Sequence, residues 1–268
     1  MSFRSKIIFM GTPNFSRVIL EGLFQAGHEI QAVFAQPDKP AGRGKKLVSL
    51  PVALFAKEKG LSLFQPQKIH DPSVIQILQG FTPDFLIVAA YGKILPEEIL
   101  IIPKKYTINV HASLLPKYRG AAPIPCALLQ GERETGVSIM QVRKELDAGP
   151  VFLEKKIAIE DFENTMTLTQ TLAELGTKAL LEVIEKITTE NLLPIEQDHA
   201  QATYAKKLTK GMVPIDWKKS AMDIFSQVRA LNPWPVAETN FQAAGADRPT
   251  TLRIFEAQVG APPRGPVQ

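Results

Sequence analysis

The chain has 268 residues, of which 45% are hydrophobic and 22% charged, and its formal net charge is +4 at pH 7. This balance is typical of a globular protein and excludes a collagen-like or largely disordered chain. The single cysteine, Cys126, excludes an internal disulfide, and no apolar run reaches the roughly 18 residues of a membrane span. We therefore expect a reduced, cytoplasmic protein of one or two domains with no membrane partner.

The first 160 residues alternate short apolar runs with helical patterns. Strands are predicted at residues 6–10, 30–35, 85–90 and 107–111, and helices at residues 15–26, 51–59 and 73–78. The third strand is apolar throughout, which is typical of a parallel sheet covered by helices on both faces. The pattern predicts an α/β fold with a doubly wound, mostly parallel sheet, whose ligands bind beyond the carboxyl ends of the strands.

Further strands at residues 136–141 and 151–159 and a helix at 165–186 are expected to complete this domain, residues 1–190. Residues 191–219 contain several lysines and no long apolar period, so we expect a basic linker there. A helix at 221–230 and strands at 236–241 and 251–259 predict the start of a second domain, residues 220–268. Two strands cannot close a barrel, so this second domain is expected to be incomplete.

The turn after the first predicted strand tests for a dinucleotide site. The fingerprint of such sites needs three glycines in the pattern G-x-G-x-x-G, and only Gly11 is present in the run Gly11-Thr12-Pro13-Asn14. A nicotinamide-dependent dehydrogenase is therefore disfavoured.

The densest polar pattern lies at the end of the strand 107–111. Asn109 and His111 are two positions apart, so their side chains lie on one face of that strand, near its carboxyl end. Asp147 follows the strand 136–141 in a polar turn and is expected to reach the same edge of the sheet. Alone, the histidine would fit a core position and the aspartate a plain turn, but together they favour a site.

An Asn/His/Asp set with no activated hydroxyl or thiol argues against covalent catalysis and suits acyl transfer to a nucleophile that the substrate brings. The amide and an imidazolium stabilise the oxyanion of a tetrahedral intermediate. The carboxylate keeps the imidazole charged and guides a water that shuttles protons. The other histidines, His28, His70 and His199, are scattered along the chain, so no metal site is expected.

The run NVHASLLPKYRG at residues 109–120, with the run LDAG at residues 146–149 downstream, resembles the signature of the folate-dependent formyltransferases. The resemblance continues at residues 8–15, 36–46, 90–96, 120–124, 135–140, 204–208 and 232–235. It is closest to the members of the family that formylate initiator methionyl-tRNA, and it covers the chain from about residue 6 to 259.

This resemblance implies a Rossmann-like catalytic domain, a basic linker, and a C-terminal OB-like barrel that binds tRNA and of which only the start is present. It also implies 10-formyltetrahydrofolate as the formyl donor, the α-amino group of initiator methionyl-tRNA as the acceptor, a monomeric enzyme of translation initiation, and no metal. Asn109, His111 and Asp147 match the family's catalytic residues. Folate contacts are implied for Ser113, Leu114, Leu115 and Pro116 and, at the neighbouring strand end, for Tyr91, Gly92, Lys93, Ile94 and Leu95.

Two segments concentrate the positive charge of the chain. Residues 36–50 have a net charge of +3 and are expected to form a mobile loop at the tRNA acceptor end, whereas residues 204–219 have a net charge of +4 and are expected to follow the tRNA stem. The expected tRNA-binding residues are Lys39, Arg43, Lys45 and Lys46 in the first segment and Lys206, Lys207 and Lys210 in the second. A solvated surface is the ordinary role of such runs, whereas phosphate contacts would make binding strongly salt-dependent.

Three alternatives remain open from the sequence. The same Asn/His/Asp set suits a formyltransferase that acts on a nucleotide-linked amino sugar, and it also suits a hydrolase that releases formate from the same donor. A non-catalytic module that binds tRNA or folate is the third alternative. The two basic segments favour tRNA over an amino sugar, and the intact catalytic set argues against a non-catalytic module.

Overall fold

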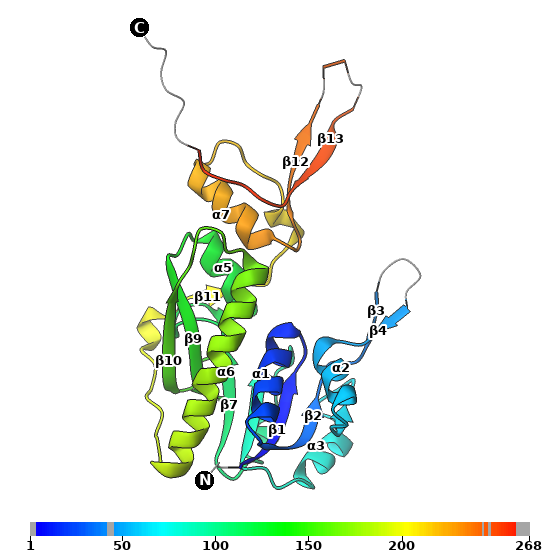
Figure 1. The fold of residues 1–268 in the computed structure, drawn as a ribbon, viewed down its shortest axis with the longest axis vertical. Coiled ribbons are helices and arrows are strands. Elements are labelled where there is room, and N and C mark those ends of the chain that lie inside the picture. Colours follow the sequence, from blue (N-terminus) through cyan, green and yellow to red (C-terminus); the bar gives the residue numbers. More distant parts are fainter. Residues whose placement is uncertain (1–3, 42–45, 243, 246–247, 261–268) are drawn as a thin grey trace.

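The computed structural model describes residues 4–41, 46–242, 244–245 and 248–260, with the side chains of residues 39–48 excepted. Its centre is a seven-stranded sheet with the strand order β10-β9-β7-β6-β1-β2-β5 (Figure 1). The strands are β1 (Lys6–Gly11), β2 (Glu29–Phe34), β5 (Leu63–Phe64), β6 (Phe85–Ala89), β7 (Tyr106–His111), β9 (Glu134–Gln141) and β10 (Val151–Ala158). The pairs from β5 to β7 are parallel, and β9 is antiparallel to both of its neighbours. The predicted mostly parallel α/β sheet is confirmed.

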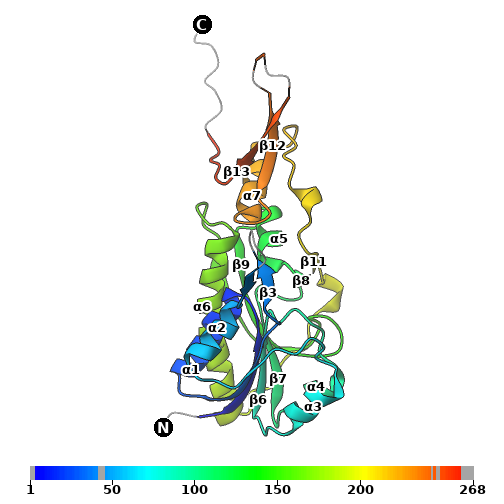
Figure 2. The same ribbon diagram turned by 90° about the vertical axis from the view of Figure 1, so that its right-hand side faces the viewer.

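Helices cover both faces of this sheet. The helices α1 (Asn14–Gln25), α2 (Pro51–Glu58) and α6 (Thr165–Thr189) lie on one face, and α3 (Pro72–Gln79) and α4 (Glu97–Leu100) lie on the other (Figure 2). In β1, Ile7 and Phe9 pack into the core under α1 and α6, whereas Ile8 and Met10 pack into the core under α3. This alternation follows from the two-residue period of a strand, and it is the pattern of a sheet that is covered on both faces.

The helix α6 fixes the position of the strand that holds the candidate catalytic residues. It begins with a capping box in which Asn164 and Thr167 each bind the other's main chain. A Cβ atom on Gly176 would lie only 2.8 Å from Cγ1 of Val110, so the glycine allows α6 to pack closely against β7. Val110 lies between Asn109 and His111, and the packing of α6 therefore sets the position of both.

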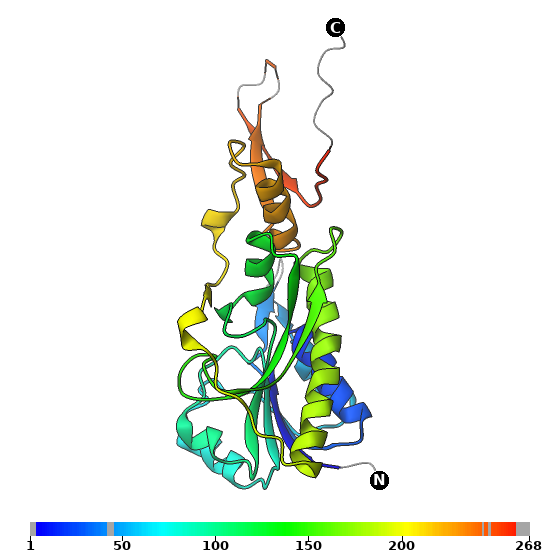
Figure 3. The ribbon, with the colours of Figure 1, turned by 90° about the vertical axis from the view of Figure 1, so that its left-hand side faces the viewer.

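The segment predicted as a linker, residues 191–219, contains two short 3-10 helices, η1 (His199–Gln201) and η2 (Lys210–Met212), and the strand β11 (Tyr204–Ala205). The strand β11 pairs in parallel with β8 (Arg119–Gly120), so the segment runs along the side of the catalytic domain next to α5 (Pro123–Leu129) (Figure 3). The interpretation as a plain linker missed this pairing, because a two-residue strand has no periodicity to detect.

The segment expected to be a mobile basic loop is partly regular. The strands β3 (Lys39–Ala41) and β4 (Lys46–Val48) form an antiparallel pair, so the expectation of a loop throughout is wrong for these ends. Arg43 and Lys45 lie outside the described residues, and only the backbone of Lys39 and Lys46 is described.

The C-terminal unit consists of α7 (Ala221–Leu231) and the antiparallel pair β12 (Ala237–Phe241) and β13 (Thr250–Ile254), which fits the expected start of a second domain. Its small core includes Ile215, Val228 and Leu231. The unit contacts the first domain where Thr165 Oγ1 donates a 2.7 Å hydrogen bond to the carbonyl oxygen of Ala230. In the described parts of the chain, none of the helices is both long and apolar enough to cross a bilayer.

Candidate active site

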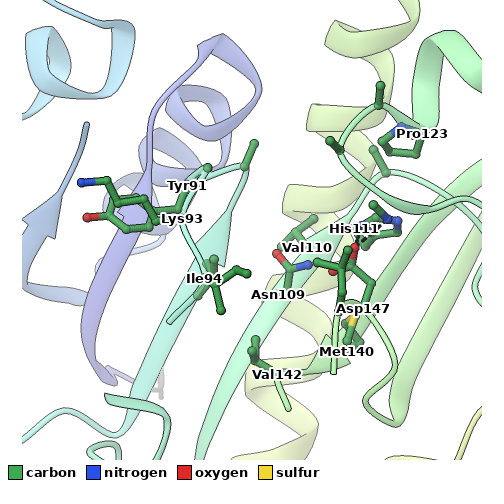
Figure 4. A pocket seen from close by; sticks show the side chains of 18 of the residues that line it. Tyr91, Lys93, Ile94, Asn109, Val110, His111, Pro123, Met140, Val142 and Asp147 are labelled. Atoms are coloured by element: carbon green, nitrogen blue, oxygen red, sulfur yellow. Dashed lines mark hydrogen bonds and ion pairs between the residues drawn. The ribbon is translucent and has the colours of Figure 1, made fainter. Parts of the chain in front are cut away.

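A cavity of about 580 Å³ opens at the carboxyl ends of β6 and β7 (Figure 4). Residues 90–95, which follow β6, form one wall, and residues 142–147, which follow β9, form the opposite wall. Residues 109–111 of β7, Ala112 after it and residues 120–125 around the start of α5 also line the cavity. The size is within the range of roughly 300–1,000 Å³ that small-molecule sites occupy, and the position is the one that α/β sheets use for ligands.

His111 and Asp147 form the buried polar centre of this cavity. The Nδ1 atom of His111 lies 3.8 Å from Oδ2 of Asp147, and the side chains are 6% and 14% exposed. The Nε2 atom of the same ring lies 2.9 Å from the main-chain oxygen of Tyr118. Nε2 therefore donates a hydrogen bond to that carbonyl oxygen, whereas Nδ1 faces the carboxylate across a longer gap.

Asp147 is held by the strand β8. Its Oδ2 atom accepts a 2.8 Å hydrogen bond from the main-chain N–H of Gly120. Three non-glycine residues around the site have left-handed backbone: Ala90 with φ +42°, Tyr118 with φ +59° and Asp147 with φ +49°. Such backbone costs roughly 1–2 kcal/mol per residue and clusters at functional sites.

Asn109 lies two residues before His111 on β7, and its side chain extends toward Asp147 (Figure 4). Within the described residues, the Asn109 amide takes part in no hydrogen bond, so its two donor hydrogens remain available to a ligand. The structure thus brings together the three residues that the sequence predicted as catalytic, on one side of the cavity.

The wall formed by residues 91–95 contains all five residues predicted to contact folate after β6. Tyr91 is buried, its carbonyl oxygen accepts a 3.0 Å hydrogen bond from Gln36 Nε2, and burial raises the pKa of its hydroxyl to about 12. Lys93 Nζ donates a 3.2 Å hydrogen bond to the carbonyl oxygen of Pro66, so this lysine tethers the wall to a neighbouring loop. Ile94 is 82% exposed and offers an apolar surface at the cavity.

The other predicted folate residues, Ser113, Leu114, Leu115 and Pro116, are not among the residues that line this cavity, and their contact with folate stays a prediction. Ser113 Oγ donates a 2.7 Å hydrogen bond to the carbonyl oxygen of Lys117, and the main-chain N–H of Leu115 donates one of 3.0 Å to Ser138 Oγ. This loop packs against β9, where it supports the turn after His111.

The three predicted tRNA-binding lysines of the second basic segment, Lys206, Lys207 and Lys210, are exposed. Lys206 and Lys207 follow β11 directly and Lys210 begins η2, and within the described part of the chain none of the three has an acidic partner. Their charges are therefore free to face a polyanion.

Sequence reasoning missed the polar side chains that support the site from behind. Arg119 and Gln197 are both buried, and Oε1 of Gln197 accepts hydrogen bonds of 3.1 and 2.6 Å from Nε and Nη2 of Arg119. The two residues are 78 positions apart, and no local pattern links them. The one available signal was the place of Arg119 inside the polar run after His111.

The fold and the site define a folate-dependent formyltransferase. The family described as "Formyl transferase" matches residues 5–184, and "Formyl transferase, C-terminal domain" matches residues 207–263. The methionyl-tRNA formyltransferase of Methylococcus capsulatus is 44% identical over 254 residues, which are 95% of this chain and 80% of the relative. That of Dictyoglomus thermophilum is 48% identical over 253 residues, 94% of this chain and 79% of the relative. The chain belongs to the methionyl-tRNA formyltransferase family.

A solved structure supports the fold. The N-formyltransferase of Helicobacter canadensis, in complex with folinic acid and dTDP-3-aminofucose, superposes with a TM-score of 0.66 at 18% identity. The match covers 85% of this chain and 80% of that chain. At this identity the likeness shows a shared fold and no more.

Proposed function

We propose that the chain transfers a formyl group from 10-formyltetrahydrofolate to the α-amino group of initiator methionyl-tRNA, for translation initiation. The observation that carries this proposal is the arrangement of Asn109, His111 and Asp147 in one cavity. The family relationship supports both the donor and the acceptor.

The proposed reaction forms a bond between the attacking amine and the formyl carbon and breaks the bond from that carbon to N10 of the folate. The Asn109 amide donates a hydrogen bond to the oxyanion of the tetrahedral intermediate, and the positive charge of the His111 imidazolium stabilises the same oxyanion. The Asp147 carboxylate stabilises the positive charge of the ring and guides the proton that the amine loses toward the departing N10. No protein nucleophile is needed, because the substrate brings its own.

The acceptor is assigned from the exposed lysines after β11 together with the family relationship. Lys206, Lys207 and Lys210 are proposed to contact tRNA phosphates, and the segment of residues 36–50 is proposed to contact the acceptor end. We also propose that the enzyme is cytoplasmic, where initiator tRNA is used, and that it acts as a monomer, since one chain provides all three catalytic residues.

The test is a transfer assay with a donor carrying a radiolabelled formyl group and three acceptor conditions. Charged initiator methionyl-tRNA is expected to become labelled in proportion to enzyme. Preferential labelling of a dTDP-linked amino sugar would contradict the tRNA assignment. Rapid release of labelled formate without an acceptor would indicate a hydrolase, and no turnover of any kind would contradict the enzymatic function.

A further inference from the structure

The segment between the two domains contributes a side chain that holds the turn of Asp147. Gln197 is buried, and its Nε2 atom donates hydrogen bonds to the carbonyl oxygens of Asp147, at 3.0 Å, and Gly149, at 2.6 Å. Its Oε1 atom accepts both hydrogen bonds from Arg119. The side-chain amide thus donates its two N–H groups to the turn that contains Asp147 and Gly149, and its oxygen accepts from Arg119.

The partner on the oxygen side is a buried cation. Arg119 is 4% exposed, and within the described residues it has no carboxylate partner; its Nη2 atom also lies 2.9 Å from Nδ1 of His199, which accepts there. A glutamate at position 197 would be the more usual partner for a buried guanidinium. A glutamate, however, has no N–H group for the carbonyl oxygens of Asp147 and Gly149. The glutamine therefore indicates that the hydrogen bonds to these two oxygens are required.

The turn to which Gln197 donates, residues 147–149, is tight and strained. Asp147 has left-handed backbone, and a Cβ atom on Gly149 would lie 1.9 Å from the carbonyl oxygen of Gln141. Backbone of this kind persists only where the surroundings hold it in place. Gln197 links this turn to Arg119 of β8, next to the Gly120 N–H that binds the Asp147 carboxylate.

The strand β8 is in turn held by the same segment. The main-chain N–H of Arg119 donates a 2.9 Å hydrogen bond to the carbonyl oxygen of Thr203, and Thr203 Oγ1 accepts one of 2.8 Å from the main-chain N–H of Tyr118. The carbonyl oxygen of Tyr118 is the partner of His111 Nε2. Residues 197–205 therefore hold the main-chain groups that contact both His111 and Asp147.

We propose that Gln197 is a positioning residue for formyl transfer: it fixes the Asp147 turn so that the carboxylate faces His111. The segment after α6 is then part of the active-site scaffold as well as a connection. The inference rests on the proposed function for its kinetic readout and on the structure alone for its spectroscopic readout.

Two variants separate the donor side of Gln197 from its acceptor side. Gln197→Glu keeps an oxygen acceptor for Arg119 and loses the N–H groups for Asp147 and Gly149, whereas Gln197→Met loses both. Positioning of Asp147 predicts that both variants lower kcat roughly 10²-fold, with the KM for both substrates little changed. If the glutamine served only to compensate Arg119, Gln197→Glu would retain full activity and Gln197→Met would not, which would overturn the proposal.

The matched control is Gln79→Glu, the same chemical change at an exposed side chain at the end of α3, outside the segment of residues 197–205. It is expected to retain wild-type kcat. The spectroscopic readout is the amide proton resonance of Gly120, which hydrogen bonding to the Asp147 carboxylate shifts downfield. Gln197→Glu is expected to move this resonance upfield, toward its position in Asp147→Ala, and an unmoved resonance would contradict the proposal. If the wild type transfers no formyl group, the proposed function fails while this readout still tests the positioning.

Discussion

The main-chain N–H of Gly120 donates its 2.8 Å hydrogen bond to the same carboxylate oxygen of Asp147 that faces Nδ1 of His111 at 3.8 Å. The backbone amide therefore takes the short contact, and the histidine is left at a distance beyond a direct hydrogen bond. At this separation, the effect that we propose for Asp147 on the ring is one of charge. The charge of Asp147 and its ability to accept a hydrogen bond can thus be tested separately.

Asp147→Asn is the variant that separates them. The asparagine side chain keeps an oxygen acceptor for the Gly120 N–H but removes the negative charge beside His111. We expect the single-turnover rate constant of formyl transfer to fall by about 10²–10⁴-fold. The variant lacks the negative charge that is proposed to stabilise the imidazolium and to guide the proton from the amine to N10. The melting temperature should change little, and the control Asp161→Asn, at an exposed position before α6, should retain full activity. Near-wild-type transfer by Asp147→Asn would exclude a role for the charge.

Asn109 is predicted to act as an oxyanion donor, and two substitutions test this. Asn109→Ala removes the amide and should lower kcat by about 10²–10³-fold, the usual effect of losing one oxyanion donor. Asn109→Asp has nearly the same shape but places negative charge near the developing oxyanion, so its kcat should be lower than that of the alanine variant. Both rates are measured at saturating substrate in single turnovers. Asn240→Asp, at an exposed position of β12, is the control. Equal rates for the aspartate and alanine variants would argue for simple packing.

Much of the fold was predictable because its elements have strong local signals. The strand β6 is a continuous apolar run, and α6 repeats buried apolar residues at helical spacing, so both were located to within a few residues. Asn109 and His111 were predictable as a pair because strand geometry places alternate residues on one face. Asp147 was placed by its position after the next strand of the sheet, together with the chemistry that a histidine requires.

The scaffold behind the site was not predictable, for a physical reason. The strands β8 and β11 are two residues long and about 85 positions apart in the sequence. The hydrogen bonds from Gln197 to the turn of Asp147 join residues about 50 positions apart. These contacts come from the tertiary path of the chain, and neither periodicity nor composition records them. The side of the loop 113–116 that faces the cavity is likewise not specified by its sequence proximity to His111, and its contact with folate stays a prediction.

The lysines after β11 predict a salt-dependent affinity for tRNA. Replacing Lys206, Lys207 and Lys210 by alanine should weaken binding and also lower the slope of log Kd against log salt concentration by about 0.7–0.9 for each phosphate that these side chains neutralise. The measurement is tRNA binding over a series of salt concentrations. The control is the double variant of Lys104 and Lys105, which are exposed at the start of β7, away from the carboxyl ends of the strands. Weaker binding with an unchanged slope would show that these lysines do not contact phosphates.

His28 predicts how the stability of the protein responds to acid. Burial lowers the pKa of this ring, and its Nδ1 atom accepts a 3.2 Å hydrogen bond from the main-chain N–H of Ser5, which requires that nitrogen to be unprotonated. The unfolded chain therefore binds a proton on His28 at a higher pH than the folded protein does. The contribution of His28 to stability is then complete above the unfolded pKa of about 6.5, and it is lost as the pH falls toward the lower folded value.

The variant His28→Asn keeps an oxygen acceptor for the Ser5 N–H and cannot titrate. Its melting temperature should fall less steeply than that of the wild type as the pH is lowered through and below about 6.5, so the two curves converge in acid. The same substitution at the exposed His70 is the control and should leave the wild-type pH dependence in place. A His28→Asn curve that runs parallel to the wild type over this range would show that protonation of His28 is not coupled to unfolding.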